Sequence, residues 1–502
     1  MMGVDAEIES LRSTVSRHFP VTQIVVNPFA ITFHVVVRVD ALDANFDALR
    51  QELIPKNYVP TIVEEQGTTV IHIQRRPEPR FRGTYVNLLL LIVTIGTTWV
   101  AGAVNWQLYT NADLFTIDSF VFGFVSFTVP LLGILGAHEM AHYLTAKRHH
   151  VRASLPFFIP SVPILGTFGA FISMRDPIPD RKALLEIGVS GPLVGFLLAL
   201  PITVVGLFLT GGNVGSPAVP TGGGEITMPS LLYGWIQSFF PASLVDPFRR
   251  HPTAFAGWVG LFVTAINLLP AGQLDGGHVA RALLGDKQRY ISWAAVVLLL
   301  VLGLGYPGWF LFALIILLLG VRHPPPLNDI TKLKPTRQAL GILAIVILIL
   351  TFVPTPLIEV SGEPAFAFET ATTPHVALTE LPVRIMAGAS RIVSLNLNNT
   401  GNVYERVEVW IDPQNLDSFG WTIRIENYTK YVDSVPLLTH VAGGLALIEL
   451  NATEYATIQI LVRVPAAASS QVYSWAVLGK IVEPATDAQA LVVQLPVRIT
   501  VP

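Results

Sequence analysis

Seven apolar runs fill the middle of the chain, and they limit its fold more than any other feature of the sequence. A helix that crosses a bilayer needs about 20 predominantly apolar residues. The first four runs reach this length, whereas the fifth and sixth are short and are joined by Tyr306-Pro307-Gly308. These two form either a tight helical hairpin or a re-entrant pair, and both return the chain to the side it left. The runs lie near residues 84–105, 119–146, 184–209, 253–280, 291–305, 309–321 and 338–354.

The composition agrees with a membrane protein that carries soluble parts. Charged residues make up 13% of the 502 residues and hydrophobic residues 51%, whereas soluble domains contain about 25% charged residues. The formal net charge of −3 gives no reason to expect a nucleic-acid partner. The absence of cysteine excludes disulfides, thiolate metal ligands and thiol catalysis.

Basic residues predict how the helices are oriented, because Lys and Arg gather in cytoplasmic loops. They cluster at residues 75–82, 147–182, 281–289 and 322–337, while the connections 106–118 and 210–248 contain none. The pattern predicts a polytopic α-helical membrane protein with about seven crossings, a cytoplasmic N-terminus and a C-terminus outside.

Residues 154–174 are apolar enough to form another crossing, but prolines at 156, 160 and 163 disfavour a regular helix. Backbone groups left unpaired in lipid are costly unless they are buried in protein or line a cavity. We therefore expect a re-entrant or sheet-like loop packed among the helices. A kinked spanning helix is the alternative.

Two flanking regions differ from the apolar middle, which we place at residues 83–356. Residues 1–82 combine helical and strand-like patterns and predict a small cytoplasmic α+β domain. Residues 357–502 alternate apolar and polar positions between frequent turns, which predicts an all-β sandwich of immunoglobulin-like type outside the cell.

The second apolar run contains the motif His138-Glu139-Met-Ala-His142. A four-residue spacing places the two histidines on one helix face, where both imidazoles can bind one tetrahedral zinc ion. Glu139 is placed to take a proton from an attacking water. Each ionisable group at membrane depth costs roughly 2.5–3.5 kcal/mol on insertion scales, so three in five residues require a partner such as a divalent metal. The alternative is a polar helix end that reaches the interface near Lys147.

The fourth long run supplies a third ligand. Asp275 is an isolated carboxylate in its later part and lies at a similar depth to the histidines in the predicted topology. Pro270 interrupts the helix, so Asn267 can turn inward and donate hydrogen bonds to a substrate carbonyl. The alternative role for Asp275 is a helix N-cap before Gly276.

These motifs resemble the site-2 protease family of intramembrane metalloproteases over roughly residues 84–354. The sequences from Leu165 to Ala170, from Gly191 to Leu193 and from Arg322 to Pro326 are similar to its microbial and plastid branch. No connection is long enough for the peptide-binding PDZ domain that many bacterial members insert, and both flanking domains fall outside the resemblance.

The resemblance implies roles for individual residues and a cofactor, Zn²⁺. His138, His142 and Asp275 would be the zinc ligands, Glu139 the catalytic base, and Asn267 a neighbour of the scissile carbonyl. The loop containing Gly166, Phe168 and Gly169 would be the edge against which the substrate lies.

The function expected from these features is zinc-dependent hydrolysis of peptide bonds within or near transmembrane segments of other proteins. A metal-ion or proton transporter that uses the same His, Glu and Asp cluster is the alternative, and a catalytically silent binding protein is a third hypothesis. We expect a multi-pass protein of a prokaryotic cell membrane, in contact with the lipid bilayer and with transmembrane protein substrates. Homo-oligomerisation stays open.

Overall fold

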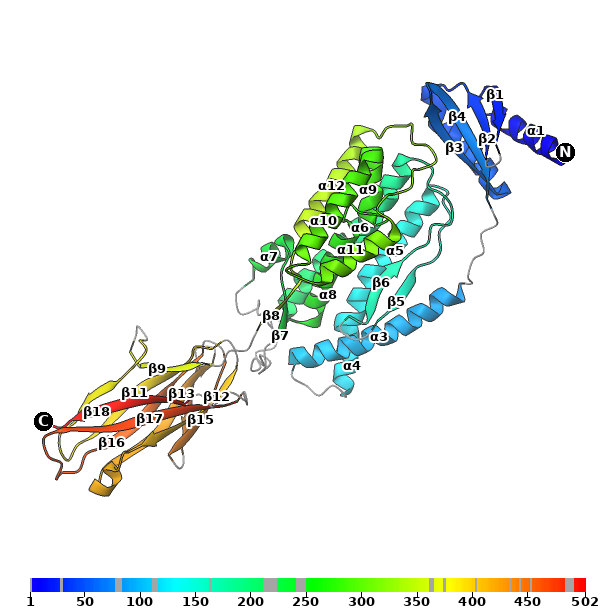
Figure 1. Ribbon diagram of the computed structural model, residues 1–502. Helices are drawn as coiled ribbons and strands as arrows, with labels where there is room; N and C mark the ends of the chain where they lie inside the picture. Colours follow the sequence, from blue (N-terminus) through cyan, green and yellow to red (C-terminus); the bar gives the residue numbers. More distant parts are fainter. Residues whose placement is uncertain are drawn as a thin grey trace. The chain divides into compact units, whose positions relative to one another are not determined.

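The computed structural model divides the chain into two compact units, Met1–Asn213 with Thr227–Leu357, and Val214–Ile226 with Ile358–Pro502. The first unit holds an N-terminal domain and a set of apolar helices, and the second holds a β-sandwich (Figure 1). The structure describes residues 2–27, 30–76, 84–110, 116–161, 165–210, 224–240, 250–360, 365–372, 376–401, 404–432, 435–441, 444–451, 454–483 and 492–502.

The N-terminal domain packs two helices with a four-stranded antiparallel sheet of strand order β1-β2-β4-β3. Its core is formed by apolar side chains from both helices and the sheet, including Leu49, Phe33 and Ile62, which are almost fully buried. The elements are α1 (Met2–Ser16), β1 (Val21–Val26), β2 (Ile31–Val35), α2 (Leu42–Leu53), β3 (Tyr58–Glu65) and β4 (Thr68–Arg75).

Within the residues that the structure describes, three helices are long and apolar enough to cross a membrane. They are α3 (Tyr85–Thr110), the continuous helix Ile117–Arg148 and α6 (Arg181–Thr210). The second of these consists of α4 (Ile117–Gly123), a π-helical turn (Phe124–Thr128) and α5 (Val129–Arg148). The remaining helices are α7 (Leu231–Gln237), α8 (Pro252–Asn267), α9 (Asp275–Leu284), α10 (Gln288–Leu302), α11 (Gly308–Leu319) and α12 (Pro335–Thr351). We call α3 to α12 the membrane part.

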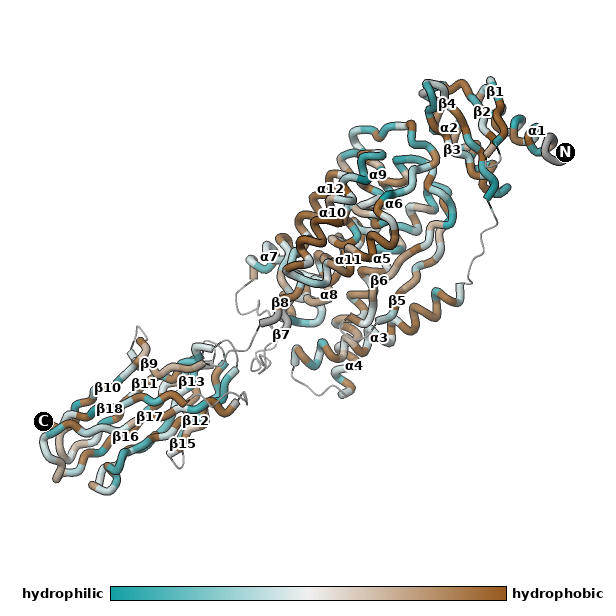
Figure 2. The backbone as a smooth tube through the Cα atoms, viewed as in Figure 1, coloured by the Kyte–Doolittle hydropathy of each residue, from teal (hydrophilic) through white to brown (hydrophobic). Residues whose placement is uncertain are grey.

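The helices of the membrane part expose apolar side chains outward. Phe208 on α6 is 72% exposed and Leu318 on α11 is 77% exposed. Figure 2 shows α10 and α11 as hydrophobic along most of their length. Such extensive exposed apolar surface is unusual for a soluble protein and agrees with burial in lipid.

The fourth apolar run, residues 253–280, is interrupted around Pro270 as the sequence predicted, and it forms two separate helices. α8 ends at Asn267, and α9 begins at Asp275 after a turn that contains Pro270. Gly272 takes a positive φ of 55° in this turn, a conformation that favours glycine. The turn separates Asn267 from Asp275 and places each of them at a helix end.

Residues 154–174 form a sheet-like hairpin rather than a spanning helix in the part that the structure describes. Strand β5 (Phe157–Pro160) pairs antiparallel with β6 (Thr167–Phe171), and β5 packs against α3 (Figure 1). Gly166, at the turn before β6, has a φ of +73° and approaches the α3 backbone so closely that a Cβ would lie 2.5 Å from the Thr97 oxygen.

The C-terminal region is all-β and consists of two five-stranded sheets with orders β10-β18-β17-β12-β15 and β14-β13-β16-β11-β9. Alternate residues such as Leu395, Val407, Ile458 and Trp475 are fully buried in its core. Its strands are β9 (Phe366–Thr370), β10 (Leu381–Arg384), β11 (Ser390–Asn399), β12 (Glu405–Asp412), β13 (Thr422–Val432), β14 (Val435–His440), β15 (Leu445–Leu450), β16 (Tyr455–Arg463), β17 (Val472–Glu483) and β18 (Val492–Thr500). A short pair, β7 (Gly224–Thr227) and β8 (Leu357–Val360), forms a separate two-stranded sheet.

Candidate metal centre

Helix α5 places His138 and His142 one turn apart on the same face, with their ring centroids 4.8 Å apart. Glu139 follows His138 directly, and all three side chains are buried. Because these polar groups are buried, water cannot hydrate them fully. They therefore require hydrogen bonds to one another or a ligand that they share.

Asp275 completes a triangle of donor atoms from two helices. Nε2 of His138 lies 3.1 Å from Nε2 of His142. Oδ2 of Asp275 lies 3.2 Å from the His142 nitrogen and 3.3 Å from the His138 nitrogen. Ligands at about 2.0–2.1 Å from a tetrahedral zinc ion are themselves roughly 3.3 Å apart. The triangle therefore fits the size of a zinc site with a fourth position open.

The second nitrogen of His142 is held by the main chain of α6. Nδ1 lies 2.8 Å from the carbonyl oxygen of Ile187 and donates to it when the ring is neutral. That hydrogen bond leaves the lone pair of Nε2 directed at the donor triangle, which is the usual way in which proteins orient a histidine ligand.

Two glycines of α6 make room for the two histidine rings. A Cβ on Gly191 would lie 2.1 Å from Nε2 of His142, and a Cβ on Gly195 would lie 3.2 Å from Nδ1 of His138. Gly191 contributes to the family resemblance, but its contact with the His142 ring was not predicted from the sequence. The spacing of small residues at 188, 191 and 195 on an apolar helix was the available signal, because small residues permit close helix packing.

Asp275 reaches the triangle from the first turn of α9. Gly276 and Gly277 allow that turn to pack against the preceding chain, since a Cβ on Gly276 would lie 2.0 Å from the carbonyl oxygen of Leu268. Asn267, the last residue of α8, places its amide nitrogen 3.3 Å from Nε2 of His138. The interruption between α8 and α9 thus brings both polar side chains to the same point.

A cavity of 190 Å³ opens beside the donor atoms, and we call it the catalytic cavity. Glu139 lies in its wall with Oε1 3.9 Å from Nε2 of His138, and it accepts a hydrogen bond from the Ile172 backbone. The cavity is lined by His138, Glu139, His142, Ala170, Phe171, Ile172, Met174, Ile187, Asn267, Gln273, Leu274, Asp275 and His278.

The structure brings together five of the eight residues selected from the sequence: His138, Glu139, His142, Asn267 and Asp275. The other three lie elsewhere on the hairpin and do not line this cavity: Gly166 packs on α3, Phe168 is 78% exposed, and Gly169 faces open space.

The hairpin contributes Ala170, Phe171 and Ile172 to the catalytic cavity instead. Strand pairing decides which residues of a hairpin reach a site, and the spacing of glycines did not reveal the register.

The matches to a family model and to curated proteins agree with each other. Residues 126–304 match Peptidase family M50. The chain is 33% identical over 304 residues to "Probable zinc metalloprotease EGY1, chloroplastic" of Arabidopsis thaliana, covering 55% of this chain and 54% of that protein. It is 29% identical over 235 residues to "Probable zinc metalloprotease EGY2, chloroplastic" of the same plant, covering 46% and 42%. The chain thus spans about half the length of the curated relatives it matches.

The solved structures that align with this chain include bacterial chaperones. The E. coli chaperone DraB, for example, is 11% identical and covers 28% of this chain and 56% of its own, at a TM-score of 0.18. That score is too low to indicate a shared fold.

Proposed function

We propose that this chain, whose residues 126–304 match Peptidase family M50, is a zinc-dependent endopeptidase that cleaves peptide bonds within or near transmembrane segments of other membrane proteins. The observation that carries the proposal is the triangle of two histidine nitrogens and one carboxylate oxygen, with sides of 3.1–3.3 Å, beside a buried glutamate. The triangle lies on helices of a membrane part, where the substrate would be another membrane segment.

The proposed ligands of zinc are His138, His142 and Asp275. Bound zinc would polarise a substrate carbonyl and lower the pKa of a water molecule. Glu139 would accept a proton from the attacking water and pass it to the departing amide nitrogen. Asn267 would donate a hydrogen bond from its side-chain amide to the carbonyl oxygen as negative charge develops there.

The substrate must unwind before it can be cut, because a helical peptide bond is hydrogen-bonded within its own helix. The β5–β6 hairpin offers an extended strand beside the catalytic cavity, to which an unwound segment can add as a further strand. In this proposal Gly166, Phe168 and Gly169 shape the strand rather than touch the reacting bond.

The proposed topology has about seven crossings, a cytoplasmic N-terminal domain (1–82), a membrane domain (83–356) and an immunoglobulin-like domain outside (357–502). The short helices α8, α10, α11 and α12 would supply the crossings beyond the three long ones. The native chain has no cysteine, so single cysteines in each loop and a membrane-impermeant thiol reagent test this topology. The proposed location is a prokaryotic cell membrane.

The experiment that tests the proposed activity uses the full chain in proteoliposomes with a panel of single-pass membrane proteins. We expect cleavage that stops when a chelator removes the metal and resumes when zinc is added. Uptake of zinc into the same vesicles is measured in parallel. Metal accumulation without cleavage of any panel member would instead support a transporter.

A further inference from the structure

A second and larger cavity adjoins the catalytic cavity. It has a volume of 450 Å³ and shares Phe171, Ile172, Met174, Gln273 and His278 with the smaller one. One wall is the extended chain that continues β6 through residues 172–178, and the other wall is residues 323–326. We call the second wall the proline segment, since it reads His323-Pro324-Pro325-Pro326.

The extended chain turns one hydrogen-bonding edge toward this larger cavity. On its other edge, the Ser173 oxygen accepts a hydrogen bond from the Ser154 N–H at 2.9 Å, and the Arg175 N–H donates to the Arg152 oxygen at 2.7 Å. Because backbone groups of a strand alternate between its two edges, those of Ile172 and Met174 face the cavity. The Ile172 backbone already donates to Glu139.

Beyond the cavity the two walls join. The Leu327 N–H donates to the Ile178 oxygen at 3.0 Å, and the Asn328 N–H donates to the Pro179 oxygen at 2.8 Å. Before these bonds, residues of both chains line the 450 Å³ cavity. The cavity is therefore a gap in a strand-like arrangement, directly beside the candidate metal centre.

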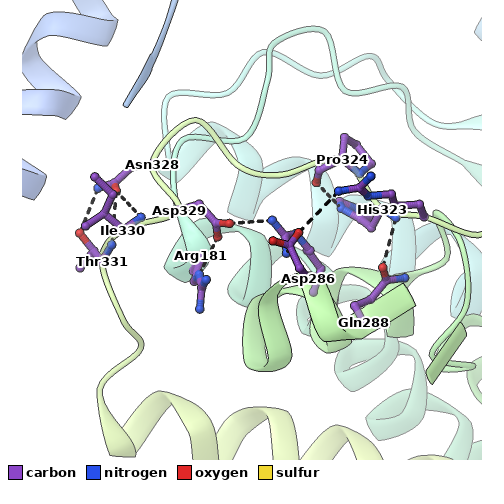
Figure 3. A network of polar contacts seen from close by, with 11 residues as sticks. Arg181, Asp286, Gln288, His323, Pro324, Asn328, Asp329, Ile330 and Thr331 are labelled. Atoms are coloured by element: carbon purple, nitrogen blue, oxygen red, sulfur yellow. Dashed lines mark hydrogen bonds and ion pairs between the residues drawn. The ribbon is translucent and has the colours of Figure 1, made fainter. Parts of the chain in front are cut away.

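The proline segment is a rigid wall. Proline fixes its own φ and offers no N–H, so three in succession present a preformed surface. The His323 ring packs on the His278 ring with centroids 4.5 Å apart, and the His323 N–H donates to the side-chain oxygen of Gln288 at 3.3 Å. Figure 3 shows Gln288 beside His323 and Pro324.

Ion pairs hold the chain that follows the proline segment. Asp329 accepts from Arg181 of α6 at 2.7 Å and from the buried Arg281 of α9 at 2.6 Å. The Leu327 oxygen also accepts from the Ile62 N–H of the N-terminal domain at 2.9 Å. The contacts around Asp329 are visible in Figure 3. These contacts hold the chain after the proline segment against α6, α9 and the N-terminal domain.

We propose that the larger cavity binds, in extended form, about four residues of substrate on one side of the scissile bond, and that the proline segment is their second wall. This inference rests on the proposed protease function and adds a substrate-positioning element to it. Ile172 to Asp176 spans four residue steps, about 13 Å of extended chain. Substrate residues in the cavity would be uncharged, because its only carboxylate, Asp176, already pairs with Arg152 and Arg76.

The absence of cysteine from the chain permits a direct test. Pro325→Cys places a thiol on the exposed part of the proline segment, and Lys332→Cys places one on the same loop outside the cavity. Both are made with Glu139→Gln, so that the substrate is not consumed. A single-pass substrate then carries one cysteine at each successive position around its cleavage site, and disulfide formation is measured.

We expect Pro325→Cys to cross-link to a run of about four consecutive substrate positions on one side of the cleavage site, and Lys332→Cys to cross-link to none of them. The inference fails if the run is absent, or if both cysteines give the same pattern. Cleavage of the same substrates by the wild-type chain is scored separately. If the substrate is cleaved but the consecutive cross-links to Pro325→Cys are absent, only the inference is refuted. If these cross-links form but the wild type cleaves no substrate, only the proposed function is refuted.

A kinetic measurement separates positioning from structural damage. The double variant Pro324→Ala/Pro325→Ala should raise KM about fivefold while kcat stays within about twofold, because the lost wall contacts bind the substrate but do not touch the reacting bond. Lys332→Ala is the matched control and should change neither constant. A fall in kcat at unchanged KM would contradict the proposal.

Discussion

Replacing Gly191 by alanine should abolish tight zinc binding, although Gly191 is not itself a proposed ligand. The new Cβ would lie 2.1 Å from Nε2 of His142 and 2.5–2.6 Å from two ring carbons, whereas ordinary contacts begin at 3.4 Å. The ring or helix α6 must therefore shift by about 1.3 Å, but metal–ligand distances tolerate only about 0.2 Å. We expect zinc affinity to fall at least on the order of 100-fold, the upper end of the range for residues that orient ligands.

Two other glycines give this prediction a graded control. A Cβ on Gly195 would lie 3.2 Å from Nδ1 of His138, so Gly195→Ala should weaken zinc binding only severalfold. A Cβ on Gly133 of α5 meets nothing within 4 Å, so Gly133→Ala should bind zinc as the wild type does.

The assay for this series is competition with a zinc chelator of known affinity, performed on purified full-length protein, with circular dichroism to verify helix content. A Gly191→Ala protein that is folded and binds zinc within twofold of Gly133→Ala would refute the reasoning.

Three further predictions concern other parts of the chain. Arg50→Met should remove the hydrogen bonds that the buried guanidinium donates to the oxygens of His149 and His150 at the end of α5, and hydrogen exchange of the last turn of α5 should rise by a factor corresponding to about 2 kcal/mol. Burial raises the pKa of Glu405 to about 7, so the charged form destabilises the sandwich. A fragment covering 358–502 should lose on the order of 2–3 kcal/mol of unfolding free energy between about pH 4.5 and pH 7 in denaturant titrations, and Glu405→Gln should remove this dependence. Gly169→Val should lower cleavage at unchanged zinc content, because a φ of +104° strains a β-branched residue in the hairpin.

The sequence predicted most of the helices and most of the site because both depend on local patterns. The runs near 84–105, 119–146 and 184–209 coincide to within a few residues with the observed helices α3, α4–α5 and α6. The spacing of His138 and His142 determines their common helix face, and the observed nitrogens are 3.1 Å apart.

Contacts between distant segments were not predictable in the same way. The sequence around Gly191 does not indicate that a side chain at this position would overlap a histidine some fifty residues earlier in the chain. The overlap arises only when α5 and α6 pack together. Pro270 predicted the break between Asn267 and Asp275, but the residues at which the two helices end and begin were not predictable, for a related reason. A hydropathy pattern does not reveal the ends of a turn whose backbone groups form hydrogen bonds with the surrounding protein.

The strand register of the β5–β6 hairpin was also not predictable from the sequence. Glycines at 166 and 169 marked an irregular strand but not which residues would face the catalytic cavity. That depends on the pairing of Phe157 with Phe171 across the hairpin, and a shift of one residue would turn every side chain to the opposite face.

The most direct test of the central claim compares zinc content and substrate cleavage in the wild type and in Glu139→Gln. We predict that both proteins hold zinc, since Glu139 is not a proposed ligand, and that only the wild type cuts a transmembrane substrate, because Gln cannot accept the proton from water. A Glu139→Gln protein that cleaves at the wild-type rate would contradict the role assigned to this carboxylate. A wild type that binds no zinc would contradict the account of the site as a whole.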